Sequence, residues 1–127
     1  MIAKVDGTHK IRILVVEDDF FAAKVATIIF EEKDCIVDCA STGKEALNKE
    51  IDCYDLILLD IGLPDLDGFE VAKLIRKNYK TPPIIMLTAH EDEGNVALAK
   101  QLDINGFFIK PLTKATGDLL LSQFVCR

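Results

Sequence analysis

Five short apolar runs alternate with longer segments of helical periodicity, and this alternation most limits how the chain can fold. The runs are four to six residues long and mostly apolar on both faces, as parallel strands must be when helices cover both sides of their sheet. The segments between them are typical of helices that pack on such a sheet. The pattern predicts one doubly wound α/β domain. The predicted strands are residues 11–16, 35–39, 56–59, 84–88 and 106–109.

Several helix boundaries are marked in the sequence. Thr42-Gly-Lys-Glu45 and Asp67-Gly-Phe-Glu70 each place a short oxygen side chain where it can accept hydrogen bonds from the open N–H groups of a first turn. A fourth helix is predicted over residues 94–102, and a fifth is predicted after Pro111, ending near Phe124. In the first helix, apolar spacing predicts a face that meets the sheet. That face consists of Phe21, Val25, Ile28 and Ile29.

The composition is that of a soluble globular domain, with 50% hydrophobic and 28% charged residues in 127 positions. Every apolar run is far shorter than the roughly 20 residues that span a bilayer. Because the first ten residues also lack the apolar stretch of a signal peptide, we expect a cytoplasmic protein. We expect a flexible lead at residues 1–10 and a folded domain at residues 11–125. The net charge of −6 disfavours direct nucleic-acid binding.

The chain has four cysteines, and no two of them form a C-x-x-C pair. Their neighbours resemble those of strand or strand-entry positions, which predicts buried, reduced thiols rather than a metal site. These cysteines are Cys35, Cys39, Cys53 and Cys126.

Charged and polar residues stand where four of the predicted strands end: Glu17-Asp18-Asp19, Asp60, Thr88 and Lys110. In a doubly wound sheet, ligands bind at this carboxyl edge. Two carboxylates about 4 Å apart repel by about 4 kcal/mol at an effective dielectric of about 20, so such a cluster needs a cation. Carboxylate oxygens and water suit Mg²⁺ or Mn²⁺. With a lysine ammonium and a hydroxyl donor, these are the components that phosphoryl transfer requires.

The same residues resemble the receiver domains of bacterial two-component response regulators, from about Ile11 to Phe124. The sequences that carry the resemblance are ILVVED, DIGLPDLDG, LTA and IKP, in the family's order. The resemblance implies a flavodoxin-like (βα)5 fold with strand order 2-1-3-4-5. It also implies a regulatory phosphoacceptor domain, CheY-like, that catalyses its own aspartyl phosphorylation and dephosphorylation and is not an enzyme with a separate substrate.

The resemblance also implies a role for each acidic residue. Asp60 resembles the family's phosphoacceptor, and both Asp18 and Asp60 resemble its Mg²⁺ ligands. Glu17 would act on the metal through a water molecule, and the backbone carbonyl of Gly62 would complete the protein ligands. Asp19 is the acid that this assignment leaves out.

A second group of residues resembles the switch and the rate-setting positions of the family. Thr88 resembles the switch hydroxyl and Phe107 the switch aromatic, while Lys110 would contact the phosphoryl group and precede a cis proline bond. Gly62 and His90 depart from the commonest family pattern. Because these two positions influence phosphoryl lifetime in the family, we expect them to tune that lifetime here.

The resemblance further implies the partners of such a domain. ILVVEDDFFAAKVA and LTAH look like receivers of hybrid sensor kinases, and only 16 residues follow Pro111, too few for a DNA-binding output domain. The domain would then be the cytoplasmic part of a membrane-bound kinase. A histidine kinase would donate the phosphoryl group, and a phosphotransfer-domain histidine would receive it. The face between the fourth and fifth helices is the expected docking or homodimer surface.

Two other functions fit the residues less well. A Mg²⁺-dependent aspartate-nucleophile phosphatase of the haloacid dehalogenase type also uses Asp, Lys and Mg²⁺, but such enzymes resemble D-x-D after the first strand. Here Asp18 is followed by Asp19 and Phe20, and the isolated Asp60 stands on the third strand. A flavin-binding module would need phosphate-binding amides in its first loop, where three acids would repel phosphate.

Overall fold

The computed structural model describes residues 10–89 and 93–125, and it confirms the predicted doubly wound fold. Five parallel strands form one sheet in the order β2-β1-β3-β4-β5. Each strand lies within two residues of the predicted bounds, and a short 3₁₀ helix at Ile51–Cys53 was not predicted. The strands are β1 (Arg12–Val16), β2 (Ile36–Ala40), β3 (Leu56–Asp60), β4 (Ile84–Thr88) and β5 (Gly106–Ile109).

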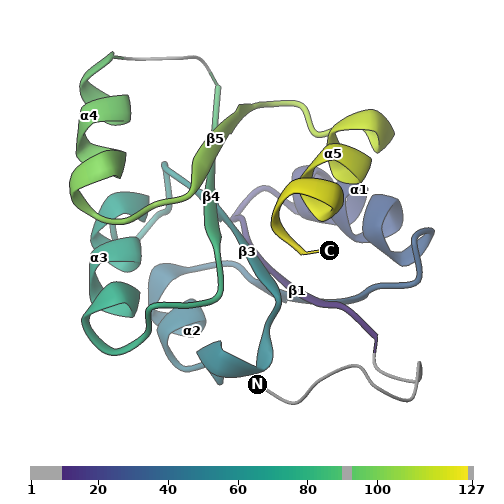
Figure 1. The fold of residues 1–127 in the computed structure, drawn as a ribbon, viewed down its shortest axis with the longest axis horizontal. Coiled ribbons are helices and arrows are strands. Elements are labelled where there is room, and N and C mark those ends of the chain that lie inside the picture. Colours follow the sequence, from purple (N-terminus) through teal and green to yellow (C-terminus); the bar gives the residue numbers. More distant parts are fainter. Residues whose placement is uncertain (1–9, 90–92, 126–127) are drawn as a thin grey trace.

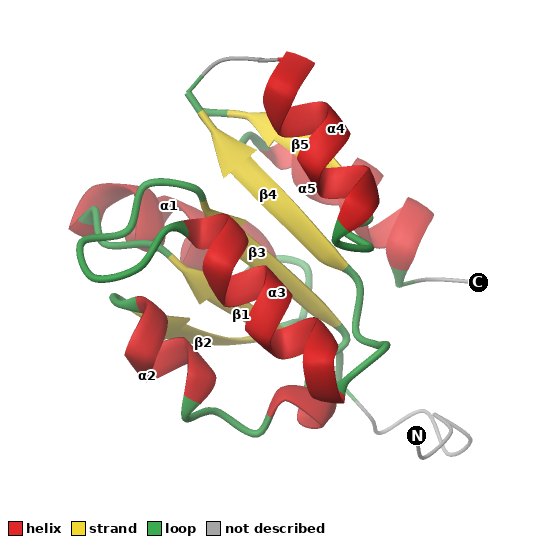
Figure 2. Cartoon of the chain, turned by 90° about the vertical axis from the view of Figure 1, so that its left-hand side faces the viewer, coloured by secondary structure: helices red, strands yellow, loops and turns green. Residues whose placement is uncertain are grey.

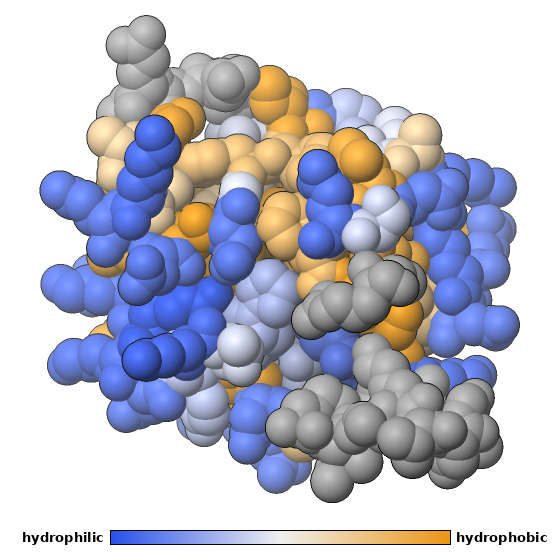
Figure 3. Space-filling model, in the orientation of Figure 1, coloured by the Kyte–Doolittle hydropathy of each residue, from blue (hydrophilic) through white to orange (hydrophobic). Residues whose placement is uncertain are grey.

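Helices cover both faces of the sheet. On one face lie α1 (Phe20–Glu31) and α5 (Lys114–Phe124), and on the other lie α2 (Gly43–Leu47), α3 (Gly68–Asn78) and α4 (Glu93–Gln101) (Figure 1, Figure 2). None of the helices that the structure describes is both long and apolar enough to cross a membrane. Polar side chains cover much of the surface seen in Figure 3.

The sheet separates two apolar cores, because successive side chains along each strand point to opposite faces. Leu14 and Val16 of β1 pack with α2, α3 and α4, whereas Ile13 and Val15 pack with α1 and α5. The central strand β3 is buried at every position. Burial of each such side chain contributes about 1.5–3 kcal/mol, so the apolar strands fix the positions of the residues that follow them.

The predicted helix starts are confirmed by their hydrogen bonds. The Thr42 hydroxyl accepts from the Glu45 N–H at 3.0 Å, and Asp67 Oδ1 accepts from the Phe69 N–H at 2.7 Å. Asp19 caps α1 in the same way, since its carboxylate accepts two N–H groups of the first turn. A cap of this kind stabilises a helix by about 1 kcal/mol.

The predicted sheet-facing side of α1 is wrong. Of its four residues, Ile29 alone is buried, and the helix packs on the sheet through Ala26, Ile29 and Phe30. Apolar residues surround most of this helix, and the small Ala26 lets the backbone approach the sheet while Phe30 fills the core. The exposed fractions of the other three are 78% for Phe21, 43% for Val25 and 47% for Ile28.

The predicted burial of the cysteines is correct only for Cys35. Cys39 and Cys53 are exposed, although all three described cysteines are free thiols as expected. Cys39 lies on the edge strand β2, and its Sγ is 3.5 Å from the Thr27 hydroxyl of α1. Cys126 and the first nine residues of the predicted lead at residues 1–10 lie outside the described residues.

A matched pair of phenylalanine substitutions tests the orientation of α1. Phe30→Ala should lower the free energy of unfolding by about 3–5 kcal/mol, because it empties a fully buried site. Phe21→Ala should change it by less than about 0.5 kcal/mol, because that side chain is mostly exposed. Urea denaturation measures both, and a larger loss for Phe21→Ala would contradict this packing.

Candidate functional site

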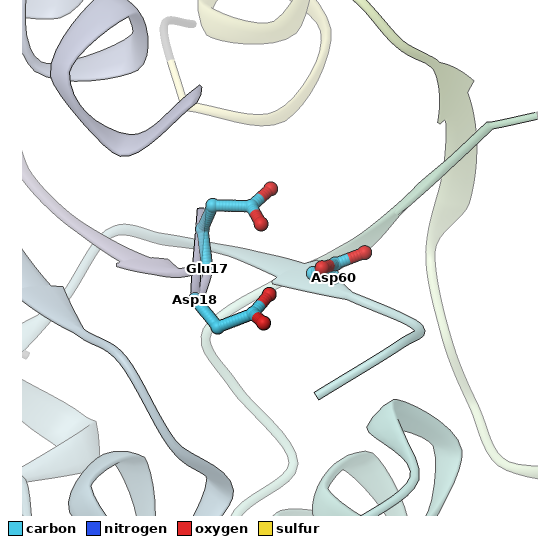
Figure 4. A group of neighbouring side chains, drawn as sticks. All are labelled: Glu17, Asp18 and Asp60. Carbon is cyan, nitrogen blue, oxygen red and sulfur yellow. The ribbon is translucent and has the colours of Figure 1, made fainter. Parts of the chain in front are cut away.

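Four of the predicted site residues meet at the carboxyl edge of the sheet. Glu17 and Asp18 follow β1, Asp60 ends β3 and Lys110 follows β5. Carboxylate oxygens of the three acids lie within 4.8 Å of one another. Figure 4 shows the Glu17 and Asp18 side chains extending from the end of β1 in the direction of Asp60. Lys110 Nζ lies 2.7 Å from Glu17 Oε1 and 3.2 Å from Asp60 Oδ1, so one ammonium contacts two of the acids.

Two of the acids are buried, and this burial shifts pKa values in the cluster. Glu17 is 3% exposed and Asp60 is 7% exposed. Burial, together with the neighbouring Asp60, raises the pKa of Glu17 despite its hydrogen bonds to Lys110 and to the Asp19 N–H. Burial acts to lower the pKa of Lys110, but its hydrogen bond to Glu17 and the charges of Glu17 and Asp60 raise that pKa overall. The ammonium therefore stays charged, and the acids around it remain in mutual repulsion.

The donor set suits a hard divalent cation. All three ligand candidates offer carboxylate oxygen, and no thiolate or imidazole belongs to the cluster within the residues described. Asp18 is exposed, which leaves a side open to water, and Mg²⁺ keeps several water ligands in proteins. Asp19 is engaged as the N-cap of α1, so its exclusion from the ligand set agrees with its contacts.

The loop after β3 folds back tightly on the strand. The Gly62 N–H donates to Asp60 Oδ1 at 3.3 Å, and Gly62 forms an isolated β-bridge with Asp67. A Cβ at Gly68 would lie only 2.3 Å from the Asp60 carbonyl oxygen, so this close approach requires glycine. At Gly62, by contrast, a Cβ would meet nothing within 4 Å. The loop thus holds Gly62 beside the site without filling the space next to it.

Sequence reasoning missed Asp65, whose carboxylate joins this loop to α2. Its oxygens accept the N–H groups of Gly43 and Lys44 at 2.8 and 2.9 Å. These partners precede it by 22 and 21 residues, so no local pattern points to them.

The predicted switch residues lie on β4 and β5, with Thr88 at the end of β4 and Phe107 within β5. Thr88 ends β4 and is 8% exposed, and its carbonyl accepts from the Lys110 N–H at 2.7 Å. The Lys110-Pro111 bond is cis, as the resemblance implied. Phe107 is half-buried and packs edge-to-face on Phe69, with ring centroids 6.2 Å apart. Phe108 packs in the opposite core, because successive side chains along a strand point to opposite faces of the sheet.

His90, the second predicted rate-tuning residue, lies outside the described residues.

Comparison with known proteins identifies the class to which this fold and site belong. Residues 13–120 match the response regulator receiver domain family. The transcriptional regulatory protein ResD of Bacillus subtilis is 37% identical over 109 residues, which are 85% of this chain and 45% of ResD. The autoinducer sensor kinase/phosphatase CqsS of Vibrio cholerae is 35% identical, over 91% of this chain and 17% of CqsS. The chain thus spans less than half the length of these relatives.

Solved structures give the same class. The non-phosphorylated receiver domain of HemR from Leptospira biflexa superposes with a TM-score of 0.82 and 32% identity, covering 91% of this chain and 94% of that one. The chemotaxis protein CheY4 of Vibrio cholerae gives a TM-score of 0.87 and 27% identity, covering 92% of this chain and all of that one.

The chain belongs to the response regulator receiver family, whose members are regulatory phosphoacceptors that interact with histidine kinases. Receiver domains bind Mg²⁺ through acidic residues, and this chain gathers three acids at the corresponding edge of its sheet.

Because the acids crowd together, neutralising Asp18 should raise the melting temperature of the metal-free protein and reduce its stabilisation by Mg²⁺. Without divalent cations, Asp18→Asn should melt at a higher temperature than the wild type, because it removes one of three clustered charges. With millimolar Mg²⁺, the wild type should gain more than the variant, because ligand binding stabilises the state that binds it. Differential scanning calorimetry with and without Mg²⁺ measures both shifts. Equal Mg²⁺ shifts in the two proteins would contradict a role for Asp18 in the cluster, and the exposed Asp52→Asn is the matched control.

Proposed function

We propose that this chain is a receiver whose Asp60 takes a phosphoryl group from a histidine kinase in a Mg²⁺-dependent reaction. The observation that supports this most is the position of Asp60 Oδ1, 3.2 Å from Lys110 Nζ, in a cluster with Glu17 and Asp18. A buried carboxylate beside one ammonium and two further acids has the surroundings of a phosphoryl acceptor. The domain at residues 11–125 would perform this function in the cytoplasm.

The transfer replaces one bond to phosphorus with another. An Asp60 oxygen forms a P–O bond as the P–N bond of the phosphohistidine breaks, and the released electron pair stays on the imidazole nitrogen, which takes up a proton. Lys110 holds its positive charge beside Asp60, where the oxygens of the incoming group carry negative charge. In dephosphorylation, water attacks phosphorus and Asp60 returns to the carboxylate as inorganic phosphate leaves.

The proposed ligands of the cation are those that the resemblance to the receiver family implies. Asp18 and Asp60 would bind Mg²⁺, or Mn²⁺, through their carboxylates, Gly62 through its carbonyl and Glu17 through a water molecule. When bound, the cation neutralises the clustered acids and the oxygens of the phosphoryl group. Glu17 suits an indirect role, because both of its oxygens already have partners in Lys110 Nζ and the Asp19 N–H.

Phosphorylation would signal by shifting the population between two arrangements of Thr88 and Phe107. A phosphoryl group on Asp60 draws the Thr88 hydroxyl toward it, and the half-buried Phe107 turns inward into the space that opens. The face between α4 and α5 would then bind a partner or a second copy of the chain. Because relatives of this chain include a sensor kinase and a hybrid histidine kinase, we place it in a hybrid-kinase setting, with relay to a phosphotransfer-domain histidine.

Intact-mass spectrometry tests the acceptor directly. Incubation with acetyl phosphate and Mg²⁺ should add one phosphoryl group to the wild type, and the group should be absent from Asp60→Asn. Asp52→Asn, which changes an exposed acid outside the site, should be labelled like the wild type. Labelling that persists in Asp60→Asn, or wild-type labelling that is indifferent to chelation of Mg²⁺, would disprove the assignment.

Phosphoryl lifetime should depend on Gly62 and His90. Gly62→Asn should fold normally, because its Cβ has open space, and its amide would reach the neighbourhood of the phosphoryl group. We expect Gly62→Asn and His90→Glu to change the half-life of the phosphorylated protein severalfold, as measured by loss of the added mass over time. An unchanged half-life in both variants would show that these residues do not set it.

A further inference from the structure

We propose that Asp65 is a positioning residue that fastens the loop between β3 and α3 to the start of α2 and so holds the Gly62 carbonyl in place for Mg²⁺. This inference rests on the proposed function, because it takes Gly62 as a ligand of the cation.

The carboxylate of Asp65 is shared between its own loop and a distant segment. Oδ1 accepts the Gly43 N–H at 2.8 Å and the Leu66 N–H at 2.9 Å, while Oδ2 accepts the Lys44 N–H at 2.9 Å. Hydrogen bonds from Lys44 and Gly43 lower the pKa of Asp65, so the group is charged at neutral pH. A charged acceptor makes the stronger kind of hydrogen bond.

Side-chain packing reinforces the same junction. A Cβ at Gly43 would lie 2.8 Å from Val71 Cγ2, closer than real Cβ contacts come, and 3.0 Å from Leu66 Cδ1, tighter than most of them. The loop residue Leu66 therefore presses directly on the α2 backbone, and Gly43 permits that approach. Asp65 and Leu66 dock on α2 as one unit.

The attachment at Asp65 can affect Gly62 because hydrogen bonds join the two ends of the loop. Gly62 and Asp67 form a β-bridge, and the Gly68 N–H donates to the Ile61 carbonyl at 2.8 Å. Residues 62–67 thus form a compact turn with Gly62 beside Asp60 and Asp65 near its tip. Within the described residues, the bonds of Asp65 are the hydrogen bonds that connect this turn to α2.

Loss of the hydrogen bonds between Asp65 and α2 should lower the fraction of molecules in which the Gly62 carbonyl faces the cation. Apparent affinity falls in proportion to the competent fraction, so a drop to between one third and one tenth raises the apparent Kd about three- to tenfold. The chemistry at Asp60 is untouched, so phosphorylation at saturating Mg²⁺ should stay near the wild-type rate.

Asp65→Ala provides the test, and Thr42→Ala is its matched control. Thr42 also accepts one N–H of α2, that of Glu45, but it has no hydrogen bond to the loop in the part of the chain described. Isothermal titration calorimetry with Mg²⁺ alone gives Kd, and acetyl phosphate labelling over a range of Mg²⁺ gives the rate at saturation. Asp65→Asn keeps one acceptor oxygen, so its Kd for Mg²⁺ should lie between those of the wild type and Asp65→Ala.

We expect a three- to tenfold higher Kd for Asp65→Ala, and for Thr42→Ala a lower melting temperature with an unchanged Kd. Wild-type Kd in Asp65→Ala would overturn the inference. Equal weakening in Thr42→Ala would also overturn it, because the effect would then come from α2 stability alone. If the wild-type chain itself neither binds Mg²⁺ nor accepts a phosphoryl group, the proposed function fails and this inference fails with it.

Discussion

The structure depends on the gathering of three acids, Glu17, Asp18 and Asp60, two of which contact the ammonium of Lys110. Carboxylates at this spacing repel by several kcal/mol at an effective dielectric of about 20, whereas one hydrogen bond contributes only about 0.5–1.5 kcal/mol. Apolar burial outweighs this cost, since each fully buried side chain of β3 contributes about 1.5–3 kcal/mol. The sheet thus holds Asp60 close to Glu17 and Asp18, from which it would separate in an unfolded chain, and their repulsion would favour binding of a cation.

Topology explains why the centre of the site was predictable from sequence. In a parallel sheet every strand ends at the same edge, so an acid after β1, an acid at the end of β3 and a lysine after β5 must converge once the strand order is known. The strands themselves were predictable because buried parallel strands are continuous apolar runs. The apolar runs therefore place Asp60 and Lys110 at one edge of the sheet, and the strand order that the family resemblance implies brings them near each other.

Features that depend on packing or on distant partners escaped prediction. On α1, apolar residues occupy most of the circumference, so periodicity did not show that the side with Ala26 and Phe30 approaches the sheet. Cys39 is exposed because its strand lies at the sheet edge, a fact set by strand order. Asp65 binds amides that precede it by more than 20 residues, and a single sequence carries no local sign of such a bond.

A crystal structure of the chain with Mg²⁺ and beryllium fluoride, which takes the place of a phosphoryl group on carboxylates, tests the central claim most directly. We predict beryllium bonded to an Asp60 oxygen, the cation on Asp18 and Asp60, and Lys110 Nζ within hydrogen-bond distance of a fluorine. Beryllium fluoride bound to another residue, or a Lys110 side chain turned away from an occupied Asp60, would contradict the account.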